Sequence, residues 1–146
     1  MKDIFLKAIE LLNEIPELKW KDKDKGQLEF YETRPAVDFP CALVKIELPR
    51  AEDRNSKIQD CDCLISIRLG FDFTGETSSN TPAEVLESSL SYYDIIEKVY
   101  VKFQGFGNKQ LEPFSRKSFR EETRNDGLLV AAMPFGTGFV DYSANA

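Results

Sequence analysis

The segment Asp60–Phe71 constrains the fold more than any other part of the chain. Its odd-numbered positions carry a row of apolar side chains, and its even-numbered positions are polar or small except for Leu64. Side chains alternate between the two faces of a β-strand with a period of two. The pattern therefore predicts a strand over 58–73 with one buried face and one solvent-facing face.

Length and composition predict a single domain over residues 1–146. A chain of 146 residues can bury about two thirds of its unfolded surface, so it needs no disulfide or metal to fold. Its three cysteines lack paired spacing, which favours a reducing compartment such as the cytosol. The longest apolar run is far shorter than the ~20 residues that span a membrane, so we expect no membrane partner.

The remaining apolar patterns predict two long helices and several strands. Apolar residues recur at helical spacing over Lys2–Ile15. The residues Thr81-Pro82-Ala83-Glu84 form a capping box, which predicts a helix from Thr81 to about Phe103. Further strands are predicted over 27–31, 39–48, 111–120, 128–133 and 135–142, with a polar hairpin connection over 49–57. This order predicts an α+β fold, a mainly antiparallel sheet with the two main helices packed on one face.

The residue types argue against enzymatic chemistry. The chain has no histidine, which removes the commonest general base and zinc ligand at neutral pH. Cys61 and Cys63 fall on one face of a strand, but zinc sites need more ligands at wider spacing, so packing in the core is the favoured interpretation. Asp60 and Asp62 would share the solvent-facing side. We expect no enzyme activity and no catalytic, cofactor-binding or metal-binding residues.

The charge pattern has one local exception. The chain carries a formal net charge of −6, yet residues 102–124 are net positive. This segment contains Lys102, Lys109, Arg116, Lys117, Arg120 and Arg124 against Glu112, Glu121 and Glu122. It is either a solvated face or a docking surface for an acidic partner, including another copy of the chain. A single basic strand with aromatic residues in an acidic protein does not predict specific nucleic-acid binding.

The order of elements resembles that of bacteriophage tail terminator or tail-completion (neck) proteins. The resemblance covers the amphipathic helix Lys2–Ile15, the entry Arg34-Pro35 to Phe39-Pro40-Cys41-Ala42-Leu43-Val44, and the polar connection Pro49–Lys57. It continues through the strand to Phe71, the Ser/Thr loop into the helix Thr81–Phe103, and the closing segment from Arg116 to Val140.

The resemblance implies a structural protein without enzymatic activity, encoded by a prophage, that assembles into a homo-oligomeric ring. Such a ring caps the tail tube and joins it to connector proteins, in the cytoplasm of a bacterial host and in the virion if the phage is active. The candidate subunit or partner interface comprises Arg50, Arg54, Lys109, Arg116, Lys117, Arg120 and Arg124. Two alternatives remain: a monomeric, non-enzymatic binding module that uses residues 102–124, and an enzyme without histidine, which would need a pocket with convergent carboxylates.

Overall fold

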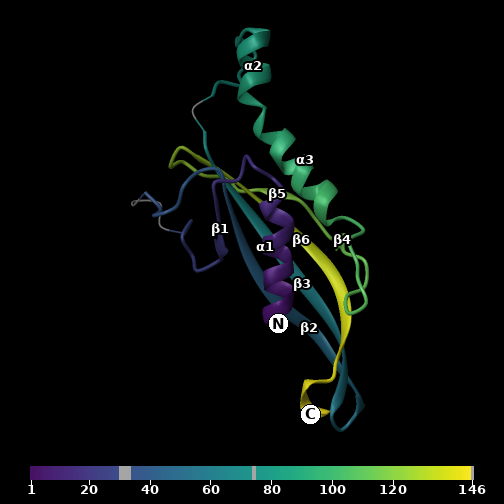
Figure 1. The fold of residues 1–146 in the computed structure, drawn as a ribbon. Coiled ribbons are helices and arrows are strands. Elements are labelled where there is room, and N and C mark those ends of the chain that lie inside the picture. Colours follow the sequence, from purple (N-terminus) through teal and green to yellow (C-terminus); the bar gives the residue numbers. More distant parts are fainter. Residues whose placement is uncertain (30–33, 74, 146) are drawn as a thin grey trace.

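The computed structural model describes residues 1–29, 34–73 and 75–145, and it confirms the α+β class (Figure 1). The helices are α1 (Lys2–Asn13), α2 (Ala83–Ser89) and α3 (Tyr92–Phe103), followed near the end by a short 3₁₀ helix, Ser143–Asn145. The strands are β1 (Trp20–Lys23), β2 (Cys41–Asn55), β3 (Ile58–Asp72), β4 (Ser115–Arg116), β5 (Arg120–Glu121) and β6 (Leu128–Asp141).

The strands form one sheet in the order β1-β2-β3-β6-β4, and β5 also pairs with β6. β1 runs parallel to β2, and every other pair is antiparallel. β3 is the central strand, and its pairing with β6 runs from Gln59 opposite Asp141 to Asp72 opposite Leu128. The segment whose alternation is clearest in the sequence is therefore the middle of the sheet.

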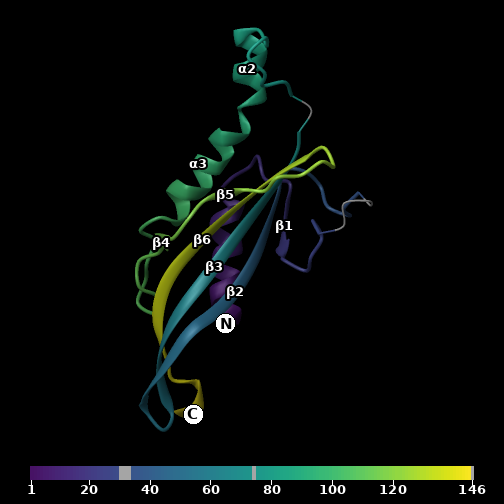
Figure 2. The ribbon, with the colours of Figure 1, turned by 180° about the vertical axis from the view of Figure 1, so that it is seen from behind.

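The helices α1 and α3 lie against the same face of the sheet, as predicted. Figure 1 shows both in front of the strands, and Figure 2 shows them behind. The register aligns Val44, Ile67 and Met133 across β2, β3 and β6 on this face. Leu12 of α1 and Phe103 of α3 pack into the same fully buried core. Each fully buried aliphatic side chain contributes roughly 1.5–3 kcal/mol, so this layer supplies most of the stability.

No helix of the described residues covers the opposite face of the sheet (Figure 2). Near β1 it holds a smaller apolar cluster of Leu28, Cys41, Leu43 and Val130, all fully buried. Trp20 of β1 packs against this cluster. Along the middle of β3 the rest of this face is polar or small except for the half-buried Leu64.

Two strands are longer than predicted, because proline interrupts a strand pattern in the sequence but not in this sheet. The segment 49–55 belongs to β2, and the register shift between Glu47 and Arg50 accommodates Pro49. β6 runs through Pro134, whose carbonyl accepts the Lys117 N–H at 2.8 Å. In an antiparallel ladder the N–H and C=O of one residue face the same neighbour, so the N–H that Pro134 lacks costs no bond to β3.

Several short elements also differ from their predictions. β1 was not predicted, and the predicted strand 27–31 is a turn at 27–28, with positions 30–31 outside the described residues. Within the predicted strand 111–120, only β4 and the first residue of β5, Arg120, are in strands. The helix predicted over 81–103 is interrupted at Leu90 and Ser91, and the predicted capping box is absent. Thr81 Oγ1 instead lies 3.1 Å from Ser78 Oγ, and Pro82 occupies the cap position.

Candidate assembly surface

Two elements project from opposite ends of the sheet (Figure 1). α2 extends beyond one end and contributes no buried residue. The tip of the β2–β3 hairpin extends beyond the other end, and Pro49–Asn55 is exposed along its whole length. Neither element packs a hydrophobic face against the domain, so both are available to a partner.

Arg50 and Arg54 lie on the hairpin and are paired across it. Arg50 contacts Asp62 through Nε at 2.7 Å and Nη2 at 3.1 Å, and it also reaches Glu52 at 2.7 Å. Arg54 contacts Asp60 at 2.6 and 3.2 Å. The hydrogen bond from Arg50 lowers the pKa of Asp62. These cross-strand pairs hold the hairpin in register and neutralise its charge, so the hairpin is polar without being basic.

The basic segment is divided between two faces of the molecule. The Arg116 guanidinium stacks over the Tyr100 ring of α3 at 4.1 Å, on the helix-bearing face. Lys117 lies beside Gly136 on the opposite face, where Arg120 of β5 pairs with Ala132. Lys109 is exposed in the loop 108–111, where it lines a pocket together with Arg50 of the hairpin. The sequence grouped these cations as one candidate interface, whereas the structure places Arg116, Lys117 and Arg120 along the edge formed by β4 and β5, and Lys109 beside the hairpin.

Arg124 belongs to an internal ion-pair network instead of a surface. Its side chain is 1% exposed and contacts Asp126 at 2.6 Å, Glu122 at 3.1 Å and the Leu28 carbonyl at 2.6 Å. Arg68 joins the network through Glu122 at 2.8 and 2.9 Å. The Arg124 guanidinium can therefore meet a partner only if this region opens, which corrects its place among the predicted interface residues.

The charges of this network shift the pKa values of its carboxylates. Burial disfavours the charged form of Glu122, but the hydrogen bonds and charges of Arg68 and Arg124 outweigh it and leave its pKa lowered. The hydrogen bond from Arg124 likewise lowers the pKa of Asp126. Because Arg124 also binds the Leu28 carbonyl, the network holds the turn at 27–28 against the small apolar cluster.

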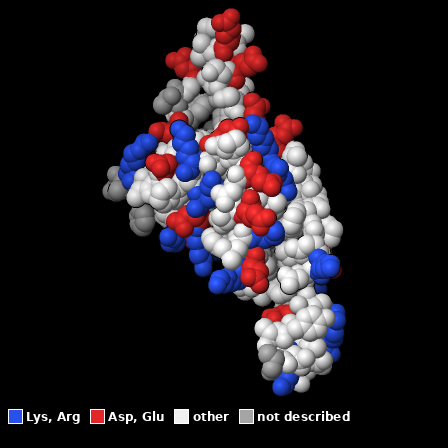
Figure 3. Space-filling model, viewed as in Figure 1, with Lys and Arg blue, Asp and Glu red and all other residues white. Residues whose placement is uncertain are grey.

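The sequence reasoning missed two exposed features. Phe119, predicted as an apolar member of a strand, is 38% exposed between Lys117 and Arg120. On α2, Val85 is 43% exposed and lies beside Glu84 and Glu87. The acidic character of this region is visible in the sequence, since residues 75–97 contain no Lys or Arg but include Glu76, Glu84, Glu87, Asp94 and Glu97. Figure 3 shows the exposed part of α2 with carboxylates only.

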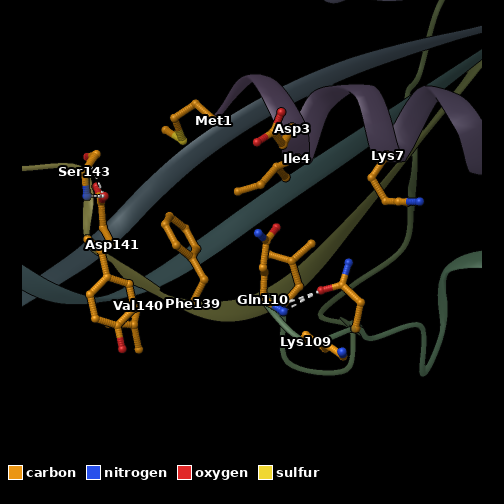
Figure 4. A pocket seen from close by; sticks show the side chains of 13 residues that line it. Met1, Asp3, Ile4, Lys7, Lys109, Gln110, Phe139, Val140, Asp141 and Ser143 are labelled. Atoms are coloured by element: carbon orange, nitrogen blue, oxygen red, sulfur yellow. Dashed lines mark hydrogen bonds between the residues drawn. The ribbon is translucent and has the colours of Figure 1, made fainter. Parts of the chain in front are cut away.

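A groove of about 540 Å³ lies between the start of α1, the loop 108–111 and the end of β6 (Figure 4). Ile4 and Phe139 point into it, and Met1 lies above them. In the loop, the Gln110 N–H donates to Asn108 Oδ1 at 2.8 Å and fixes the groove wall. Charges of both signs stand at the rim. At the end of β6, the Ser143 hydroxyl and N–H donate to Asp141 Oδ1 at 2.6 and 2.9 Å.

The three cysteines are buried as free thiols. Burial raises the pKa of Cys41 and of Cys63 to about 11, and it also raises the pKa of Cys61. A thiol with a pKa this high is not a nucleophile at neutral pH. The predicted packing of Cys61 and Cys63 is confirmed, because both are buried and Cys63 belongs to the main core. Cys41 belongs to the smaller cluster.

The described residues show no group of His, Cys, Asp and Glu side chains placed to bind a metal ion. Within the same residues, no helix is long and apolar enough to cross a membrane. No protein-family model matches the chain, and no curated protein matches it either.

Proposed function

We propose that the protein is a structural component of a bacteriophage tail, a ring-forming tail terminator or head–tail joining protein encoded by a prophage. Under this proposal it has no enzymatic activity, it acts in the cytoplasm of the bacterial host, and it remains in the virion if the phage is active. Its partners are further copies of itself, the tail-tube protein and the connector. The element order, from the amphipathic α1 to the closing strand β6, supports this assignment.

The observation that carries the proposal is the pair of unpacked projections. α2 has seven residues and none is buried. Helices shorter than about 12–15 residues are marginal in water unless packing stabilises them. The hairpin tip is exposed along Pro49–Asn55 of β2, although β6 pairs with β3 as far as Gln59. Elements of this kind are stabilised when a neighbouring subunit covers them.

The positions of the projections favour a ring over a symmetric dimer. α2 and the hairpin tip lie at opposite ends of the sheet (Figure 1). Contacts between unlike ends of successive copies are heterologous, and such contacts generate a closed ring when the rotation between subunits closes. A ring with a constant face is what a tail tube needs at its end.

Sedimentation velocity and native mass spectrometry at tens of micromolar test the proposal. We expect a closed oligomer, either from the protein alone or after addition of purified tail-tube protein, and rings in electron micrographs of the same samples. A strictly monomeric protein that forms no ring with tail-tube protein would contradict the proposal.

A monomeric binding module is the second candidate function. It is supported by the exposed cations of the β4–β5 edge, where Lys117 and Arg120 form no ion pair with another described residue. Such a module would bind an acidic ligand in a salt-sensitive manner. Titration with polyglutamate would show binding that weakens with salt and is lost in the Arg116→Glu, Arg120→Glu variant. An affinity that the double substitution leaves unchanged would exclude this function.

A further inference from the structure

The first observation is that α2 carries one sign of charge. Glu84 and Glu87 stand three residues apart, on the same side of the helix. Val85, 43% exposed, lies next to them. The nearest cation that follows in the chain is Lys98, and it is already paired with Glu17. α2 is therefore an acidic projection with an exposed apolar side chain and no internal counter-charge.

The second observation is a surface of opposite charge at the edge of the sheet. We call residues 115–121 the basic edge, and from Arg116 onward all of them are exposed. Lys117 and Arg120 flank Phe119, whose ring is 38% exposed. Aromatic and arginine side chains are enriched at protein interfaces. Both surfaces thus combine an apolar side chain with charges, and their charges are opposite.

The chain does not neutralise the basic edge by itself. Glu121 is the only carboxylate in the edge, and it is held by the Tyr92 hydroxyl of α3 at 3.4 Å. The positive charge of Lys117 contributes to lowering the pKa of Asp62. Within the described chain, however, neither Lys117 nor Arg120 forms an ion pair. α2 of the same chain projects away from the sheet (Figures 1 and 2). The carboxylates of α2 can therefore meet this edge in another copy and not in their own chain.

We infer that α2 of one copy docks on the basic edge of the next copy and forms the repeating contact of the ring. The inference rests on the proposed function and specifies its interface. Glu84 and Glu87 face Lys117 and Arg120, and Val85 contacts Phe119. The seven residues of α2 span roughly 10 Å, so the helix fits within the extended edge, which is about 20 Å long.

The net charge sets the conditions under which this contact forms. Copies with a formal charge of −6 repel one another at long range. At about 0.15 M ionic strength, charges more than about 8 Å apart are screened, while pairs in direct contact are screened less. Assembly is therefore expected to be strongest at intermediate salt and weaker at both extremes.

Charge reversal on each side, followed by both sides together, tests the inference. The α2 variant is Glu84→Lys with Glu87→Lys, and the edge variant is Lys117→Glu with Arg120→Glu. We expect each to weaken association at least about 100-fold, because like charges then meet in the contact. Combining all four substitutions in one chain restores opposite charges and is expected to restore assembly.

A matched control separates the contact from net charge. The control variant, Glu10→Lys with Asp38→Lys, changes the net charge by the same amount as the α2 variant, at exposed positions outside both surfaces. It should assemble like the wild type. Urea unfolding verifies the fold of every variant. A ring that survives both reversals, or that the combined variant fails to restore, overturns the inference and leaves the ring function standing. Loss in the edge variant alone also overturns it and assigns the edge to a different acidic partner. A wild type that stays monomeric even after addition of tail-tube protein contradicts the ring function itself.

Discussion

Replacing Arg124 by methionine tests the internal ion-pair network directly. The substitution keeps an unbranched side chain of similar length and removes the charge. Asp126, whose side chain is 9% exposed, would lose the guanidinium and keep backbone hydrogen bonds such as that from the Leu128 N–H at 3.2 Å. Breaking one partner of a buried pair costs about 3–5 kcal/mol. Because Glu122 would still be held by Arg68, we expect a loss near the lower end, about 3 kcal/mol of unfolding free energy.

Urea unfolding followed by the fluorescence of Trp20 and by circular dichroism measures this loss. Trp20 packs on the cluster that the network covers, so it reports on the same region. With a slope of about 2 kcal/mol/M, the midpoint should fall by about 1.5 M. Arg54→Met is the matched control, because its ion pair with Asp60 is half exposed and its loss should leave the midpoint unchanged. A shift for Arg124→Met no larger than that of the control would refute the reasoning.

Four further outcomes follow from the structure. Because the pKa values of Glu122 and Asp126 are lowered from 4.5 and 3.8, their stabilisation is complete above those values and is lost as the pH falls below them; Arg124→Met should flatten this acid limb in urea titrations. Gly70→Ala should cost about 1–3 kcal/mol, since its Cβ would lie 2.8 Å from Cys41 Sγ. Gly136→Ala should cost less, because only the flexible end of Lys117 must move; equal urea midpoints would contradict the comparison. A thiol reagent at pH 8 should label Cys41 and Cys63 only after unfolding, and rapid labelling of the native protein would contradict their burial.

The sequence was sufficient wherever one local pattern determined the structure. The alternation around Ile67 placed β3, and the apolar stripe of α1 placed the first helix, because each pattern matches the period of a single element. The packing of the two main helices on one face followed from the element order. These predictions needed no knowledge of distant contacts.

The predictions that failed depended on distant partners. Pro134 and Pro49 ended the predicted strands, yet each is tolerated because of where the neighbouring strand or register shift lies. Arg124 resembled a surface cation until Leu28 and Asp126 were found around it. In the same way, the basic segment is split between two faces only because β4 runs beside α3. A count of charges along the sequence does not show which side chains pair in the folded protein.

The central position of β3 also determines the order in which the sheet can form. β2 and β3 are joined by a tight hairpin, so their pairing closes a short loop and forms early. The other edge of β3 pairs with β6, for example Cys61 with Phe139, and both α2 and α3 must be made before that strand appears. Pairing between strands far apart in the sequence is slow, because the intervening loop must close, at a cost in entropy, before the contacts between the strands form. During synthesis, β3 therefore presents an apolar, unpaired edge until β6 arrives, and this interval is when the chain is most exposed to premature association.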